Sequence, residues 1–160
     1  MKIQLVTPAP LRFNNGNKIT ALRCAKILRI LGHRVKVVQQ YDSKPCDALI
    51  ALHARRSYQS IRRFHKVYPE RPLIVVLTGT DLYRDIRTHR SAQSSLKLAT
   101  RIVALQKMAL SELSESFHPK TRVIYQSAER CLSSNSQKRR DGFKVSVIGH
   151  LRKEKDPLRT

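Results

Sequence analysis

A short polar cluster, Thr78-Gly79-Thr80-Asp81, follows an apolar run at residues 73–77 (LIVVL). The cluster combines two hydroxyls, a carboxylate and a glycine, and glycine lets the backbone approach a ligand closely. Its backbone N–H groups and hydroxyls can therefore bind a sugar or an oxyanion, while Asp81 orients a hydroxyl. Under the alternative interpretation, Asp81 caps a short helical turn at residues 82–86. The two interpretations are compatible.

A second candidate group, His53, Arg55 and Arg56, follows the predicted strand at residues 47–52 (DALIAL). The forked guanidinium of arginine matches the geometry of phosphate, so this group can offer donors to an anionic ligand. The alternative is a histidine whose hydrogen bonds are satisfied within the sheet, beside two surface arginines. The position after a strand favours a functional role for His53 and Arg55, and a solvated role for Arg56.

Apolar runs and helical patterns alternate along the chain. The predicted strands are residues 2–7, 35–38, 47–52, 73–77, 101–105 and 121–125, and the predicted helices cover residues 17–31, 61–67, 91–99 and 107–116. This alternation is typical of βαβ units, so the predicted fold class is α/β, a three-layer Rossmann-like parallel sheet. In such sheets ligands bind beyond the carboxyl ends of the strands, which brings both candidate groups to one edge.

The loop at residues 13–17 (FNNGN) precedes the first predicted helix and is rich in residues that tolerate left-handed backbone. Asn17 or Thr20 is expected to cap that helix. The free N–H groups at such a helix start form a ready anion site, so residues 14–18, which include Asn15, Gly16 and Asn17, can close over the phosphates of a ligand. The alternative is a flexible turn that binds nothing.

The chain is strongly basic, with 32 lysines and arginines against 11 acidic residues and a net charge of +21. A field of this strength attracts anions, including nucleic acid, lipid headgroups, nucleotide-sugars and small oxyanions. The three cysteines form no CxxC pair, which argues against a disulfide framework or a zinc site and favours a reducing, cytoplasmic location. No signal peptide, membrane span, metal or cofactor is expected.

The composition changes toward the end of the chain. Residues 1–128 are expected to form the Rossmann-like N-terminal domain. Residues 129–142 (ERCLSSNSQKRRDG) lose periodicity and become serine-rich and basic, which is typical of a linker. Residues 143–160 are expected to be the first strand and turn of an incomplete C-terminal domain, because a lone strand cannot bury both of its faces.

Six stretches follow one another in the order of a known set of motifs. They are Asn15-Gly16 for a Gly-Gly loop, residues 31–35 (LGHRV) for LGHxV, residues 47–53 for DxxxxH, Thr78-Gly79-Thr80-Asp81 for HGxD, residues 99–105 for ADxIVxxS, and residues 149–155 for GRLxxEKG. This order resembles the N-terminal half of a GT-B glycosyltransferase, a two-domain family that uses nucleotide-sugars. The resemblance covers nearly the whole chain.

Several residues depart from the general family pattern. Thr78 replaces the usual histidine, Gln106 stands where serine is common, residues 125–128 (YQSA) replace PNGV, and His150 replaces the arginine of GRL. Together with the stretches LHARRS, LTGTDLYRDI, VIYQSAE and GHLRKEKDP, these departures make the chain similar to a narrower group, the selenosugar synthases of selenoneine biosynthesis.

The resemblance implies an enzyme that joins the N-acetylhexosamine of a UDP-sugar donor to a small anionic acceptor, selenophosphate. It implies an acceptor-side site made of Asn15, Gly16, Asn17, His53, Arg55, Thr78, Gly79, Thr80, Asp81, Gln126 and Ser127. Arg152 and Lys155 match the residues that neutralise the donor diphosphate, or alternatively belong to a solvated tail. Selenophosphate is already a charged nucleophile, so no general base is required and no catalytic residue is assigned. Without its donor half, this chain is expected to be inactive alone.

Two other functions stay open. A basic α/β module could bind nucleic acid, although the sequence lacks a nucleic-acid fold signature and does not cluster aromatic residues with its arginines. A GT-B transferase with another acceptor is the second alternative. In either transferase, an exposed interdomain face is expected to favour a homo-oligomer, with residues 143–148 adding to the sheet edge of another copy.

Overall fold

The computed structural model describes residues 1–8, 10 and 15–127. Residues 1–127 form one compact unit. The predicted linker at 129–142 and the predicted strand and turn at 143–160 lie outside the described residues, as do Arg152 and Lys155.

A parallel sheet of six strands forms the centre of this unit, with the order β2-β1-β3-β4-β5-β6. Every neighbouring pair is parallel, and β3 and β4 are in register with Leu49 opposite Leu73. The strands are β1 (Lys2–Val6), β2 (Arg34–Val38), β3 (Ala48–Leu52), β4 (Leu73–Val76), β5 (Arg101–Ala104) and β6 (Thr121–Val123). The predicted α/β fold class is confirmed, and all strands end at the same edge of the sheet.

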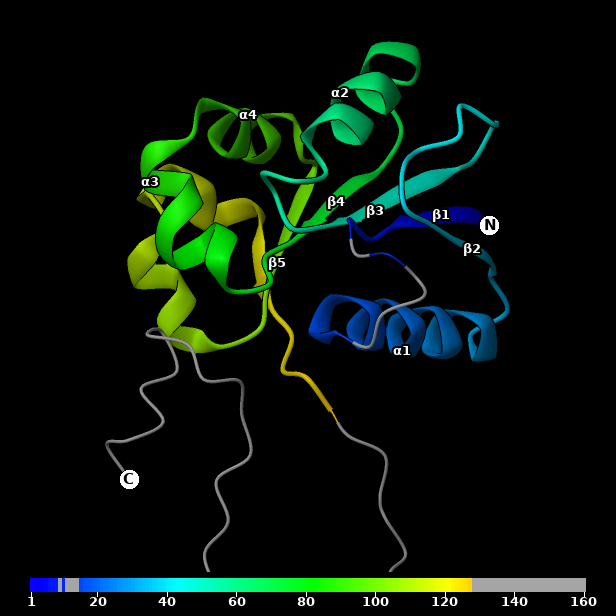
Figure 1. The fold of residues 1–160 in the computed structure, drawn as a ribbon, viewed down its shortest axis with the longest axis horizontal. Helices are drawn as coiled ribbons and strands as arrows, with labels where there is room; N and C mark the ends of the chain where they lie inside the picture. The colour runs from blue at the N-terminus through cyan, green and yellow to red at the C-terminus, as the bar shows by residue number, and fades with distance from the viewer. Residues whose placement is uncertain (9, 11–14, 128–160) are drawn as a thin grey trace, which may run out of the picture. The chain divides into compact units, whose positions relative to one another are not determined.

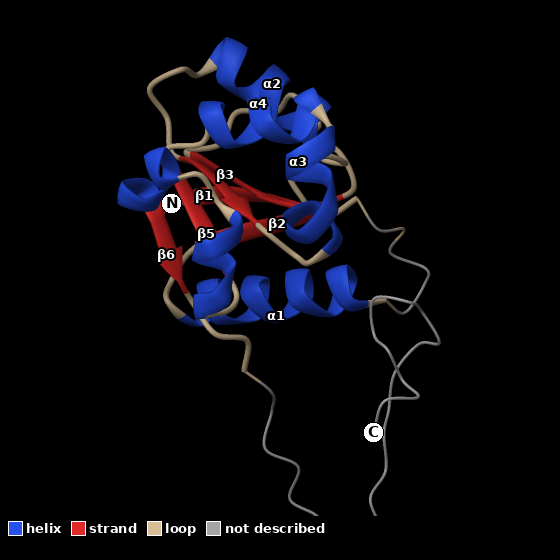
Figure 2. Cartoon of the chain, turned by 90° about the vertical axis from the view of Figure 1, so that its left-hand side faces the viewer, coloured by secondary structure: helices blue, strands red, loops and turns tan. Residues whose placement is uncertain are grey.

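Helices cover the sheet on both faces. They are α1 (Gly16–Ile30), α2 (Tyr58–Val67), α3 (Ile86–Thr88) and α4 (Arg90–Leu98), with a wide turn η1 (Asp81–Asp85) and two 3₁₀ segments, η2 (Lys107–Glu112) and η3 (Glu115–Lys120). Helix α1 lies on one face, and α2 and α4 lie on the other (Figure 1, Figure 2). Parallel crossovers are right-handed, and the step from β1 to β2 runs across the sheet in the direction opposite to the later steps, so its helix must lie on the opposite face.

Each face of the sheet has its own apolar core. On the α1 side, Ala21 and Ala25 let the helix approach Leu5 and Leu52. On the other side, Phe64 of α2 is fully buried and meets the ring of Tyr41 edge-on, with 5.5 Å between ring centroids. The second core anchors α2 immediately after the polar segment that follows β3.

Part of the sheet face beside α1 remains open. A groove of about 400 Å³ lies between α1 and residues 124–127, and its floor includes Ile50, Ile74 and Val103. Its rim exposes Ile19 and Tyr125. Only one crossover among the described strands places a helix on this face, which explains why β4 and β5 are left without a cover there.

Two predicted elements differ from the structure. The single helix predicted at 107–116 is wrong, because η2 ends at Glu112 and the next residue, Leu113, has an extended backbone at φ −94° and ψ 142°. Serine hydroxyls in this segment bond locally, as Ser111 does to the carbonyl of Met108, and such bonds compete with α-helix formation.

Among the described residues, no helix is long and apolar enough to cross a bilayer.

The cap of α1 also differs from the prediction. Asn15, rather than Asn17 or Thr20, is the N-cap, and its side-chain oxygen accepts a hydrogen bond from the Lys18 N–H at 3.0 Å. The Thr20 hydroxyl instead accepts from the side-chain amide of Gln126 at 2.9 Å. Several asparagines stand in a row before the helix, so composition alone does not select among them.

Candidate functional site

His53 lies directly after β3 with a left-handed backbone at φ 69°, and its side chain is only 2% exposed. Its Nδ1 accepts a hydrogen bond from the Arg56 N–H at 3.3 Å. The proton of the neutral ring is therefore on Nε2, which donates to the Thr80 hydroxyl at 3.2 Å. This bond joins the segment after β3 to the segment after β4.

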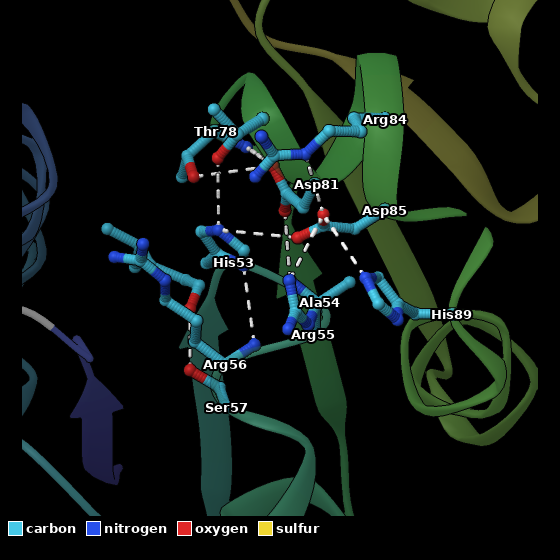
Figure 3. A network of polar contacts seen from close by, with 12 residues as sticks. His53, Ala54, Arg55, Arg56, Ser57, Thr78, Asp81, Arg84, Asp85 and His89 are labelled. Atoms are coloured by element: carbon cyan, nitrogen blue, oxygen red, sulfur yellow. Dashed lines mark hydrogen bonds and ion pairs between the residues drawn. The ribbon is translucent and has the colours of Figure 1, made fainter. Parts of the chain in front are cut away.

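Asp81 makes a second connection between these two segments. Its carboxylate is fully buried, with Oδ2 accepting from the Ala54 N–H and Oδ1 from the Thr78 N–H, each at 2.9 Å (Figure 3). The prediction that Asp81 caps a turn at 82–86 is wrong. Thr80 precedes the wide turn η1, Asp81 is its first residue, and the Asp81 carboxylate bonds to backbone outside the turn. Asp81 therefore holds the two segments at a fixed separation.

Asp85 was not predicted from the sequence as a site residue, yet it lies at the centre of the polar network. Its carboxylate is 1% exposed, and Oδ1 lies 3.4 Å from Arg55 Nη1 and 3.2 Å from Arg84 Nε. Nε2 of His53 lies 3.9 Å from Oδ2 of Asp85, and Nε2 of His89 lies 3.9 Å from Oδ1. Figure 3 shows these four basic side chains around the carboxylate. One signal for Asp85 was present: it lies four residues after Asp81, and residues four apart share one face of a helix.

Burial is the main cause of an altered pKa at His53. Desolvation lowers the pKa of the imidazole from its ordinary value, and the nearby charge of Arg56 lowers it further. The negative charges of Asp81 and Asp85 act in the opposite direction without reversing the result. The ring is neutral at pH 7, so its 3.9 Å approach to Asp85 is not an ion pair.

A neutral buried histidine makes stability depend on pH. The unfolded chain takes up a proton at His53 near pH 6.5, the ordinary value, while the folded chain resists protonation. The contribution of His53 is therefore complete above about pH 6.5 and is lost as the pH falls toward the lowered folded pKa. We expect the free energy of unfolding, measured by urea denaturation, to fall in this range.

The matched variant is His53→Asn, because asparagine tolerates the left-handed backbone but does not titrate. Its unfolding free energy is expected to fall less steeply below about pH 6.5 than that of the unchanged chain. Parallel curves for the two proteins would contradict a neutral His53 in the folded state.

The structure brings together part of the predicted site. His53, Arg55 and the cluster Thr78-Gly79-Thr80-Asp81 lie at the carboxyl ends of adjacent strands and share one polar network. Arg56, predicted to be solvated, contributes its backbone N–H to His53. The convergence of the segments after β3 and β4 follows from the parallel register of the two strands.

The other predicted residues lie elsewhere. Asn15, Gly16 and Asn17 form the start of α1, and no hydrogen bond between described residues joins them to His53 or Asp81. The side chains of Gln126 and Ser127 bond to Thr20 and Arg23 of α1, at the rim of the apolar groove.

No group of three metal-binding side chains occurs among the described residues. Cys24 and Cys46 are free thiols, and burial raises the pKa of both. No protein-family model matches the chain, and no curated protein sequence matches it. The partly exposed charged groups at the centre of the site are the guanidiniums of Arg55 and Arg84, which suit an anion better than a cation.

Proposed function

We propose that this chain is the acceptor-side, N-terminal part of a GT-B glycosyltransferase that transfers a sugar from a UDP-sugar to a small oxyanion such as selenophosphate. The observation that carries the proposal is the junction at the ends of β3 and β4. There Asp81 ties two polar segments together, and Arg55 and Arg84 stand beside them with exposed guanidiniums. The resemblance of the sequence to selenosugar synthases supports the same assignment.

In this transfer reaction, the acceptor side of the enzyme only has to bind the nucleophile and orient it. The selenium of selenophosphate forms a bond to the anomeric carbon, the bond from that carbon to the diphosphate oxygen breaks, and UDP leaves with the electron pair. The nucleophile is already anionic, so no group must remove a proton from it. His53 donates to Thr80 and Asp81 accepts from two backbone N–H groups, so both act as structural supports of the site.

Stabilisation of the departing UDP would come from the donor side of the enzyme. Arg152 and Lys155, which match the donor-diphosphate residues by resemblance, lie outside the described residues. We therefore expect this chain to bind the acceptor without catalysing transfer, because the groups that stabilise the leaving diphosphate act from the other half of the enzyme.

The test is a pair of calorimetric titrations under anaerobic conditions, one with selenophosphate and one with UDP-N-acetylglucosamine. We expect saturable binding of selenophosphate and little binding of the UDP-sugar. Potassium chloride at matched ionic strength controls for general charge effects. Absence of selenophosphate binding, or release of UDP from a mixture of both ligands above the blank, would refute the acceptor-side assignment.

The net charge of +21 is the one observation that favours nucleic-acid binding as a second candidate. Counterion release makes such binding fall linearly with the logarithm of salt concentration. Binding of duplex DNA or RNA that is tighter than selenophosphate binding and has a steep salt slope would support this second function.

A further inference from the structure

We infer that Arg55 and Arg84, held as a pair by the buried carboxylate of Asp85, form a binding site for a tetrahedral oxyanion of the phosphate type. This inference rests on the proposed function and deepens it, because it names the residues that would hold the oxygens of the acceptor. Asp85 is then a positioning residue, which acts on the ligand through the two guanidiniums.

The geometry of the pair is the first support. Arg55 follows β3 and Arg84 lies in the turn after β4, yet Arg55 Nη1 and Arg84 Nε both approach Oδ1 of Asp85, at 3.4 and 3.2 Å. Figure 3 shows the carboxylate between the two side chains. One buried oxygen thus fixes two cations that would otherwise repel each other.

Most donors of the pair remain available to a ligand. A guanidinium carries five N–H groups, and each of the two uses one nitrogen toward Asp85. Within the described part of the chain, neither guanidinium has another hydrogen-bond or ion-pair partner. The side chains of Arg55 and Arg84 are 43% and 59% exposed, so these donors reach the solvent.

The distribution of charge in depth also favours an incoming anion. The carboxylates of Asp81 and Asp85 are buried. Both oxygens of Asp81 accept from backbone N–H groups, and Oδ1 of Asp85 accepts from the two guanidiniums. The two arginine side chains contact the Asp85 carboxylate and are partly exposed to solvent, whereas Asp85 is buried. An anion drawn by the net charge of +21 therefore meets Arg55 and Arg84 before it approaches either carboxylate.

The shape of the donor set points to a tetrahedral ligand. The two guanidiniums come from different elements of the fold, Arg55 after β3 and Arg84 from the turn after β4. A phosphate-type anion presents at least three oxygens in different directions, so the two forks can contact different oxygens of one ligand. Inorganic phosphate is therefore a suitable probe, and it needs neither sugar nor selenium.

The first experiment is calorimetric titration of the whole chain with inorganic phosphate. Arg55→Ala and Arg84→Ala are each expected to weaken binding by about ten-fold or more, since each removes a charge-assisted interaction. Arg62→Ala and Arg63→Ala, on the exposed surface of α2, are the matched controls and are expected to leave the affinity unchanged. Arg55→Lys and Arg84→Lys keep the charge but lose the fork, so an intermediate loss is expected.

The second experiment separates positioning from simple charge. Asp85→Asn makes the chain more positive by one unit, so general attraction predicts tighter phosphate binding, whereas loss of positioning predicts weaker binding. We expect weaker binding by several-fold, with circular dichroism to show that the variant is folded. If Asp85→Asn does not fold, Arg55→Lys and Arg84→Lys test the inference in its place. Both arginine side chains are partly exposed, so these substitutions leave the core intact.

The outcomes also separate this inference from the proposed function. Phosphate binding that is lost in Arg55→Ala and Arg84→Ala supports the inference even if selenophosphate fails to bind. Selenophosphate and phosphate binding that survive both substitutions overturn the inference and leave the proposed function standing. Equal losses in Arg62→Ala and Arg84→Ala also overturn it, because they would reveal a diffuse field in place of a site.

Discussion

Replacing Asp81 with asparagine is expected to reduce the free energy of unfolding by about 2–4 kcal/mol, although the two side chains have nearly the same size. Both oxygens of this buried carboxylate accept from backbone N–H groups, one from the buried Ala54 and one from the partly buried Thr78. Asparagine has one carbonyl oxygen, so its NH₂ group must face one of these donors. One hydrogen bond is then lost, and one N–H group faces another donor.

Urea denaturation followed by circular dichroism measures this effect. Asp81→Ala removes both bonds and is expected to cost more, about 3–6 kcal/mol. The control is Asp47→Asn, because Asp47 is exposed and also accepts from a backbone N–H, that of Lys2, at 2.7 Å. Its expected cost is below about 1 kcal/mol. Similar losses for Asp47→Asn and Asp81→Asn would show that the buried carboxylate is not what joins the two segments.

Replacing Gly79 with alanine is expected to reduce the free energy of unfolding by about 1–3 kcal/mol. Gly79 has φ +124°, a backbone conformation that side chains bearing a Cβ rarely adopt. A Cβ built at this position meets nothing within 4 Å, so the expected cost is backbone strain without a steric clash. Because Gly79 lies between Thr78 and Thr80, relief of the strain would move both residues out of the network around His53.

Gly16→Ala is the matched control for this substitution. Gly16 also has open space around its Cβ position, but it is the first residue of α1 and has no positive φ. Alanine is a better helix former, so this variant is expected to be as stable as the unchanged chain or more stable by up to about 1 kcal/mol. If Gly79→Ala were equally neutral in urea denaturation, the strained backbone would have no part in shaping the site.

Most of the fold could be predicted from the sequence because the central strands β3 and β4 are short apolar runs that are largely buried. The run at 73–77 has five apolar residues in succession, and β4 occupies Leu73–Val76. The spacing of helices between such runs requires parallel crossovers, and parallel crossovers bring the carboxyl ends of the strands to one edge. This reasoning was sufficient to place His53 and Asp81 near each other.

The contact between Asp85 and Arg55 could not be predicted from the sequence in the same way. Arg55 is 30 residues away from Asp85, and their contact depends on the register of β3 against β4 and on the wide turn that follows β4. Gln126 and Ser127 were grouped with the site because of the resemblance to the glycosyltransferase motifs. They lie instead against α1, because a side chain after β6 can turn toward either face of the sheet.

The buried carboxylate of Asp81 has a consequence for the dynamics of the ends of β3 and β4. The amides of Ala54 and Thr78 lie outside any strand, yet each donates to an oxygen that water does not reach. Their hydrogens are expected to exchange with deuterium as slowly as those of the central strands. A recognition surface that is already rigid before its ligand arrives loses little entropy on binding, so its affinity can come from a few contacts.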